Sequence, residues 1–193
     1  VASAGYEGLA GMNLSARVEA VSANIDHDFS KENMDVIRVI CGYGVEADAH
    51  FGTTVQHLHL IKKDPTRGNL RQVHLIALER INEWNALGHP VRCGSLGENI
   101  TTSGVDLEHL PAGTRIRFQS GAEILLTGLR KPCHQVDKFS AGLLKLTVSG
   151  KEDAEIPFQI GVMGVVLVTG EIVRGEGIQL VLPSEPHHFM EKV

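Results

Sequence analysis

Glycine divides this sequence into short segments, and the segments between glycines are rich in β-branched and aliphatic residues. Glycine accounts for 21 of the 193 residues, whereas aromatic residues make up only 5%. An apolar or alternating run of about four to eight residues that ends at a turn signal has the length of a strand. Such runs occupy residues 17–24, 35–41, 70–77, 115–118, 122–127, 162–168, 171–174 and 178–182. We therefore expect a mainly β fold.

The strands are expected to curl into a barrel. Only two segments have helical spacing, 77–87 and 134–146, and they do not alternate with the strands as in a βαβ fold. Residues 119–121 separate two strands and predict a hairpin turn. The last three strands follow one another through short turns, and Pro183 ends the last of them. Many short strands with few short helices favour a closed or nearly closed β-barrel.

The length of the chain suits one domain. A chain of 193 residues fills one hydrophobic core well and is short for two. We expect the domain at residues 17–183, an N-terminal extension at 1–16, and a polar, frayed C-terminal tail at 184–193. The patterned sequence begins after Met12, which we expect to be the natural first residue.

Charge, hydropathy and cysteine content argue against several classes of function. The net charge of −5 argues against nucleic acid and anionic membranes as partners. No apolar run approaches the roughly 20 residues that a membrane-spanning helix needs, and no secretory signal is visible at the N-terminus. Three cysteines without a C-x-x-C pair do not form a disulfide framework. Reduced thiols predict a cytoplasmic protein.

Cys133 is the candidate reactive residue. It follows a predicted strand and precedes the predicted helix 134–146, and Arg130 and Lys131 lie just before it. The positive end of a helix dipole and nearby cations both favour the thiolate, which attacks electrophiles and binds soft metals. The alternative is that Cys133 is a small buried apolar residue, as free cysteines commonly are.

The other two cysteines have different surroundings. Cys41 ends the run 35–41, which we expect to be buried on both faces, so Cys41 is predicted to be an inert core residue. Cys93 lies in a Gly-containing loop beside Arg92, and no helix follows it directly. Neither is predicted to be the reactive thiol.

The segment 94–102 reads G-S-L-G-E-N-I-T-T. Its glycines let backbone amides face a ligand, and Asn99, Thr101 and Thr102 add uncharged hydrogen-bonding groups, a combination that can hold oxyanions. Glu98 would be misplaced beside an anion, so we expect it to brace the loop instead. The alternative for the whole segment is a tight glycine turn that leads into a strand.

Ten histidines raise the question of a metal site. His57 and His59 are expected on one face of a strand, without a cysteine or carboxylate at zinc-ligand spacing. His187 and His188 fall in the expected tail. We therefore expect no structural zinc site.

Taken together, these segments resemble the MOSC family, which is named for the C-terminal domain of molybdenum-cofactor sulfurases. The likeness runs from about Gly44 to Leu182, which is most of the chain. The elements that match occur in the family's order: 47–52, 71–76, 97–102, 130–133, 161–168 and 171–182. The GEN-type loop and the R-x-P-C segment are its specific parts. Ala47 departs from the glycine usual in the family, and Gly175-Glu176 departs from its Gly-Asp.

The resemblance implies a MOSC-type β-barrel in which Cys133 handles sulfur or ligates molybdenum. In members that carry the molybdenum cofactor (molybdopterin), a protein thiolate and the dithiolene of the pterin bind the metal. The amides of the Gly97 loop, with Arg71 and Arg130, would bind the pterin phosphate. Other candidate cofactor-binding residues match motif positions without an assigned role: Asp48, His50, Glu98, Asn99 and Thr101. We expect the site residues to face one cleft.

Three functions follow from this resemblance. The first is a molybdenum-cofactor oxidoreductase that reduces N-hydroxylated compounds with electrons from an external redox partner. The second is a sulfur carrier or cofactor-binding module in which Cys133 holds a persulfide. Nothing in the chain resembles the pyridoxal-phosphate half of the full sulfurases, so a donor protein would supply the sulfur. The third is a degenerate domain that only binds a partner. The oligomeric state is left open.

Overall fold

The computed structural model describes residues 16–150 and 154–193, in which two β-sheets dominate the fold. The larger sheet has eight strands, in the order β11 (Ile178–Val181), β7 (Arg115–Phe118), β8 (Glu123–Leu129), β9 (Val162–Val168), β5 (Val73–Ala77), β6 (Ile100–Ser103), β1 (Arg17–Ala23) and β2 (Glu32–Met34). The smaller sheet has the order β10 (Gly170–Val173), β3 (Val36–Ile40) and β4 (Gly44–Val45). The helices are α1 (Leu58–Ile61), α2 (Leu78–Ala86), α3 (Gln135–Phe139) and α4 (Leu143–Leu146). The expectation of a mainly β fold with few short helices is confirmed.

The larger sheet does not close into a barrel, so the barrel part of the expected fold is not confirmed. Its two ends are β11 and β2. An isolated bridge between Arg17 and Gly177 brings the start of β1 toward β11, and the Ile178 N–H donates to the Ala16 carbonyl at 2.9 Å. One edge of β1 pairs with β6 from Arg17 onward, and the other edge pairs with β2 only at Val21–Ala23. Closure is incomplete because only the first residues of β1 reach β11.

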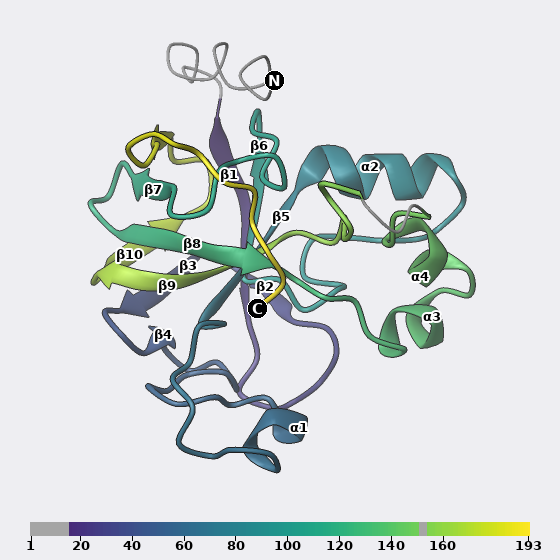
Figure 1. The fold of residues 1–193 in the computed structure, drawn as a ribbon, viewed down its shortest axis with the longest axis horizontal. Helices are drawn as coiled ribbons and strands as arrows, with labels where there is room; N and C mark the ends of the chain where they lie inside the picture. Colours follow the sequence, from purple (N-terminus) through teal and green to yellow (C-terminus); the bar gives the residue numbers. More distant parts are fainter. Residues whose placement is uncertain (1–15, 151–153) are drawn as a thin grey trace.

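The centre of the larger sheet is β5, all of whose residues are buried. It pairs antiparallel with β9 on one side and parallel with β6 on the other. A parallel pair needs a crossover connection, and α2 provides it because it lies between β5 and β6 in the chain. Figure 1 shows α2, α3 and α4 gathered on one side of the strands. The carboxyl end of β8 leads into the segment with Cys133, which precedes α3.

The smaller sheet corrects the prediction for residues 35–41. In β3, Ile37 and Val39 are buried while Val36 and Arg38 are exposed, so only one face of the strand is covered. Cys41 is exposed, because the strand ends at Ile40 and a turn follows. The prediction that Cys41 is a core residue is therefore wrong, whereas its predicted inertness stays a prediction. A β-branched composition does not distinguish one buried face from two.

The helical predictions hold in part. The predicted helix 77–87 is confirmed as α2, which buries Ile81 and Trp84 and is followed by Gly88 with a φ of 92°. The predicted helix 134–146 is wrong as a single element. Gly142 adopts a φ of 86° between α3 and α4, which breaks the helical path. Residue 57 precedes α1, so the prediction that His57 and His59 lie on a strand is also wrong.

The two ends of the chain differ in what the structure describes. The C-terminal tail is packed rather than frayed, because Met190 is buried in the core and Phe189 packs against it. The predicted extension 1–16, apart from Ala16, lies outside the described residues, as does Met12. Over residues 16–150 and 154–193, no helix has both the length and the apolar character that a membrane span requires.

Candidate functional site

Cys133 lies on the link between β8 and α3. Pro132 is buried, the Cys133 side chain is half-buried, and its Sγ lies 3.4 Å from Oε1 of Gln135. The following helix, α3, has only five residues and begins two positions after the cysteine. A helix this short has a small dipole, so the charges around the thiol matter more than the helix that follows it.

Two partly buried arginines supply those charges. Arg71 and Arg130 are close enough to Cys133 for their charges to interact with a thiolate, and they also interact with each other. Burial and the charge of Arg130 lower the pKa of Arg71 to about 10, and burial also lowers the pKa of Arg130. Guanidinium groups nevertheless stay protonated at neutral pH. Two positive charges therefore lie within electrostatic range of one thiol.

Each arginine also has an unused hydrogen-bond donor. The Nε of Arg71 and an Nη of Arg130 are buried and have no hydrogen-bond partner among the described residues. Buried donors are normally satisfied, since leaving one unpaired costs about 1–3 kcal/mol and more for a charged group. Two unpaired cationic donors beside one thiol are suited to an anionic ligand.

Backbone contacts fix both arginines. The Arg130 N–H donates to the Gly161 carbonyl at 3.0 Å. The Arg71 N–H donates to the side-chain oxygen of Asn69 at 3.1 Å, and the amide of Asn69 donates to the His50 carbonyl at 3.0 Å. Asn69 therefore links the segment of Arg71 to the segment of His50.

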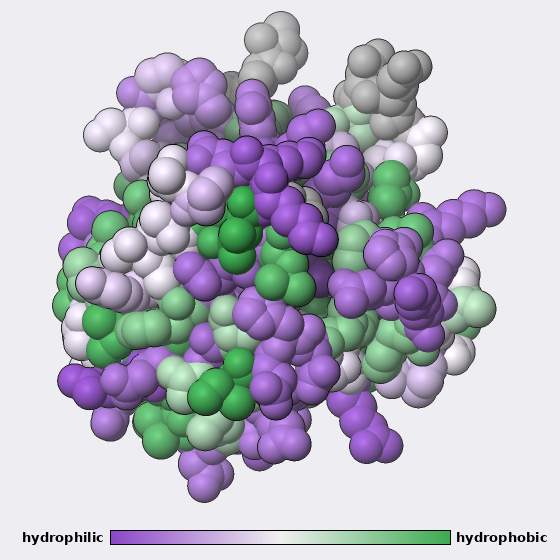
Figure 2. All heavy atoms as spheres, turned by 90° about the horizontal axis from the view of Figure 1, so that it is seen from below, coloured by the Kyte–Doolittle hydropathy of each residue, from purple (hydrophilic) through white to green (hydrophobic). Residues whose placement is uncertain are grey.

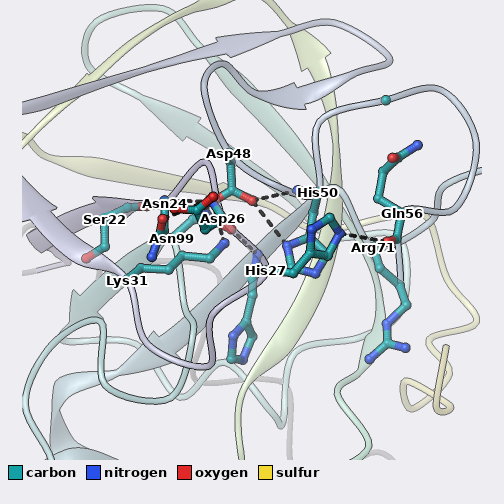
Figure 3. A network of polar contacts seen from close by, with 12 residues as sticks. Ser22, Asn24, Asp26, His27, Lys31, Asp48, His50, Gln56, Arg71 and Asn99 are labelled. Carbon is teal, nitrogen blue, oxygen red and sulfur yellow. Dashed lines mark hydrogen bonds and ion pairs between the residues drawn. The ribbon is translucent and has the colours of Figure 1, made fainter. Parts of the chain in front are cut away.

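A buried polar network lies next to these residues, centred on Asp48 (Figure 3). Asp48 accepts hydrogen bonds from Lys31 Nζ at 2.6 Å, from Asn99 Nδ2 at 3.0 Å, and from the backbone N–H of His50 at 3.0 Å. His50 Nδ1 lies 3.2 Å from the same carboxylate. The Lys31 side chain is 4% exposed and that of Asp48 is fully buried. This is an ion pair inside the protein, saturated with hydrogen bonds.

The charge states in this network follow from its contacts. Burial by itself would raise the pKa of Asp48, but the hydrogen bond from His50 and the charge of Lys31 outweigh it. The pKa of Asp48 therefore lies well below its usual range. Burial lowers the pKa of His50, so the imidazole is neutral at pH 7, with Nδ1 donating to the carboxylate. Burial also lowers the pKa of Lys31, and the charge of Asp48 opposes that change.

Three imidazoles line the outer side of this network. The rings of His50 and His57 have centroids 4.4 Å apart. The rings of His50 and His27, both labelled in Figure 3, have centroids 5.7 Å apart. Among residues 16–150 and 154–193, no group of three or more His, Cys, Asp or Glu side chains could hold a metal ion. A metal at Cys133 would thus need ligands from outside such a protein cluster, as a cofactor would provide.

The segment 94–102 is braced from within. Glu98 is fully buried and accepts the backbone N–H groups of Gly94 and Leu96, and the Gly97 N–H donates to the Gly94 carbonyl. Burial raises the pKa of Glu98, and these N–H groups oppose the rise. The amides of Gly94, Leu96 and Gly97 are thus occupied by the protein itself. The predicted bracing role of Glu98 agrees with these contacts.

Asn99 and Thr101 also face inward. The side chain of Asn99 accepts the His74 N–H at 3.2 Å and donates to the Ser22 carbonyl at 3.1 Å. The hydroxyl of Thr101 lies 3.5 Å from Glu98. These contacts connect β1, β5 and β6, so both residues support the site from behind.

Hydrogen bonds and charge interactions connect the sequence-predicted residues, and the expectation that they face one cleft stays a prediction. Charge interactions link Cys133 to Arg71 and Arg130, and link Arg130 in turn to Glu98 and Lys31. Sequence reasoning missed Lys31 and the buried His74, whose pKa is lowered well below its usual value by burial and by the charge of Arg130. A cavity of about 480 Å³ lies elsewhere, between β1, the end of β6 and Gly175, and no residue of this group lines it.

The surface near the network is mixed in character. Figure 2 shows the face that lies at the bottom of Figure 1, where α1 is found. Hydrophobic residues form separate patches there among hydrophilic ones. Among the described residues, this face shows no broad apolar surface of the kind that a large protein interface buries.

Comparisons with known proteins identify the family and the fold. Residues 62–179 match the MOSC domain. The chain is 27% identical over 193 residues to a Bacillus subtilis (strain 168) protein named "Putative metal-sulfur cluster biosynthesis proteins YuaD", covering 93% of this chain and 94% of YuaD. The crystal structure of YuaD from Bacillus subtilis has a TM-score of 0.70 at 25% identity and covers 90% of this chain and 96% of that one. YiiM from Escherichia coli has a TM-score of 0.60 at 15% identity, covering 89% of this chain and 73% of YiiM, and so resembles the chain in fold.

Proposed function

Because this chain belongs to the MOSC domain family, we propose that it binds the molybdenum cofactor through Cys133 and reduces N-hydroxylated compounds. The observation that carries the proposal is the pair of buried, unpaired guanidinium donors of Arg71 and Arg130 beside the thiol. An anionic pterin phosphate would satisfy both donors. A single soft thiolate is a suitable protein ligand for a metal whose other ligands come from a dithiolene.

Each part of the site has a role in this proposal. Cys133 would hold the metal, while Arg71 and Arg130 would hold the phosphate and balance its charge. The Lys31–Asp48 pair and Asn99 keep the surrounding segments in place. His50, 23% exposed in its side chain, is the part of this network nearest to solvent.

The bound cofactor would supply two-electron chemistry at its metal. The proposed reaction takes R–NHOH, two electrons and two protons to R–NH2 and water, with cleavage of the N–O bond. An external redox protein supplies the electrons, since no flavin, haem or iron–sulfur motif was found in the sequence. Protons come from solvent.

Analysis of bound metal and sulfur tests the proposal. The protein is produced in a host that makes molybdenum cofactor, and molybdenum and labile sulfur are measured per chain. We expect about one molybdenum per chain, because one cysteine provides one ligand position. Labile sulfur on Cys133 without metal would favour a sulfur carrier, and the absence of both would leave only a partner-binding role.

Phosphate affinity tests the arginine pair. We expect Arg71→Gln or Arg130→Gln to weaken binding of inorganic phosphate by about tenfold or more, since a hydrogen bond to a charged group contributes about 1.5–3 kcal/mol. Isothermal titration calorimetry at fixed ionic strength measures the change. Arg67→Gln is the matched control, because Arg67 is exposed yet its charge also reaches Arg71. An equal loss in all three variants would indicate general electrostatics instead of a site.

A sulfur carrier is the second candidate, favoured by the sulfur-related name of YuaD. In this case a Cys133 thiolate attacks the outer sulfur of a donor persulfide, R–S–SH. The S–S bond of the donor breaks, Cys133 becomes a persulfide, and R–S⁻ leaves. The nearby guanidinium groups would stabilise the anionic species before and after transfer.

A further inference from the structure

The last residues of the described chain run along the carboxyl end of β8. We name residues 188–193 the C-terminal strap. The Leu129 N–H donates to the Glu191 carbonyl at 2.7 Å, and the Val193 N–H donates to the Leu129 carbonyl at 3.3 Å. These bonds form a parallel bridge between Leu129 and Lys192. In Figure 1 the yellow end of the chain lies beside the arrowhead of β8.

The strap is anchored before it reaches β8. Met190 is 2% exposed and belongs to the hydrophobic core. Phe189 forms a bridge with Pro111, and the His188 carbonyl accepts the Ala112 N–H at 2.9 Å. The bonds to Leu129 therefore come from a segment that is itself fixed.

The strap and β9 hold the end of β8 from two sides. Leu129 pairs with Val162 of β9, and the next residue, Arg130, donates its N–H to the Gly161 carbonyl. Arg130 and Cys133 follow directly from this clamped position. Few other backbone contacts restrain the link before α3.

Gly128 shows how closely the strap approaches. A Cβ at this position would overlap the Glu191 carbonyl oxygen and lie 2.7 Å from a methyl group of Val193. Its φ is not in the left-handed region that favours glycine. Contact with the strap, rather than backbone conformation, is what excludes a side chain at Gly128.

We infer that the C-terminal strap is a positioning element for the cysteine, holding the end of β8 so that Arg130 and Cys133 face Arg71. The inference deepens the proposed function and rests on it, because the position of Cys133 affects cofactor binding only if Cys133 binds the cofactor. A strap that only adds packing energy would affect global stability alone. A positioning strap also affects the segment 129–133 in a protein that remains folded.

The test displaces the strap without removing it. Gly128→Ala is made in the full chain and in a chain that lacks residues 191–193, with Gly68→Ala as control because nothing lies within 4 Å of a Cβ at Gly68. Deuterium exchange at the amides of Leu129 and Arg130 measures how firmly the strap and β9 hold the end of β8. The iodoacetamide rate of Cys133, divided by that of the exposed Cys41 in the same sample, reports the position of the thiol.

We expect Gly128→Ala to speed exchange at Leu129 by about tenfold, as for a locally opened segment. The Cys133-to-Cys41 ratio should rise by about threefold, because freeing the segment exposes a half-buried thiol. In the shortened chain the substitution should add nothing, since the two changes act on one contact.

Three results would overturn the inference: no change relative to Gly68→Ala, faster exchange with an unchanged thiol ratio, or an equal effect of Gly128→Ala in the shortened chain. If Gly128→Ala does not fold, the shortened chain decides by itself, with a raised ratio supporting the strap and an unchanged one rejecting it. Both measurements are made without metal. Absence of molybdenum from the unmodified protein would reject the proposed function and leave this result standing.

Discussion

Cys133→Ser is expected to reduce bound molybdenum from about one per chain to background, because a hard hydroxyl oxygen replaces the soft thiolate ligand. The same substitution removes labile sulfur if the protein is a sulfur carrier. The fold should be retained, with a change in unfolding free energy within about 0.5 kcal/mol, since the side chain is half-buried and small. Metal analysis and thermal unfolding of the same preparation measure the two quantities.

Cys41→Ser is the matched control for this experiment. Cys41 is also a free cysteine but lies exposed at the end of β3. We expect it to keep its full molybdenum content. Unfolding of Cys133→Ser would instead identify Cys133 as a packing residue, and normal metal content would remove it from the site.

Asp48→Asn is expected to destabilise the protein by about 3–5 kcal/mol, because it leaves the buried ammonium group of Lys31 without its partner. For a chain of this size, each kcal/mol lowers the midpoint of thermal unfolding by about 2–4 °C. Urea unfolding at pH 7 measures the change. Adding Lys31→Met should recover part of the loss, since it removes the uncompensated charge.

A surface pair provides the control. Arg38 and Glu46 lie 3.8 Å apart with side chains that are 55% and 52% exposed. Glu46→Gln should change stability by less than about 1 kcal/mol, because exposed pairs are screened by water. A loss as large as that of Asp48→Asn would show that burial is not what makes the Lys31 pair important.

The effect of Asp48→Asn also has a predicted pH dependence. The pKa of Asp48 is lower in the folded protein than the value of about 4 in the unfolded chain. The contribution of ionised Asp48 to the free energy of unfolding is therefore fully present above the pKa of the unfolded chain. This contribution is lost as the pH falls toward the pKa of the folded protein. The stability difference between the unmodified protein and Asp48→Asn should shrink below about pH 4. A difference that stays constant down to pH 2.5 would contradict the assignment.

The local sequence pattern predicted secondary structure better than it predicted which residues are exposed. The spacing of Ile81 and Trp84 identified α2, since a helix with one buried face carries its own periodicity. The exposure of Cys41 was not predictable, because it depends on where the second sheet leaves one face open. Nor did the sequence signal that Gly142 would divide the segment 134–146 in two.

The motifs pointed to the candidate residues of the site. Sequence reasoning missed the residues whose burial depends on tertiary contacts. Arg71, Arg130 and Cys133 stand in recognisable segments, and the structure groups them. Lys31 lies in an irregular segment between Ser30 and Glu32 and looks like a solvated charge. Only the approach of Asp48 from 17 positions further along the chain makes it a buried residue. Such a pairing leaves no local periodicity to detect.

The position of β9 has a consequence for the order in which the molecule forms. The strand next to Arg71, β5, and the strand that leads to Arg130, β8, do not pair with each other; both pair with β9, which follows them in the chain. Non-local pairings of this kind close long loops and fold slowly, in milliseconds to seconds for comparable β-rich domains. The two arginines can meet only after β9 has been synthesised and inserted. Until then the arginine pair beside Cys133 is not assembled, so under the proposed function the ligand would bind late in folding.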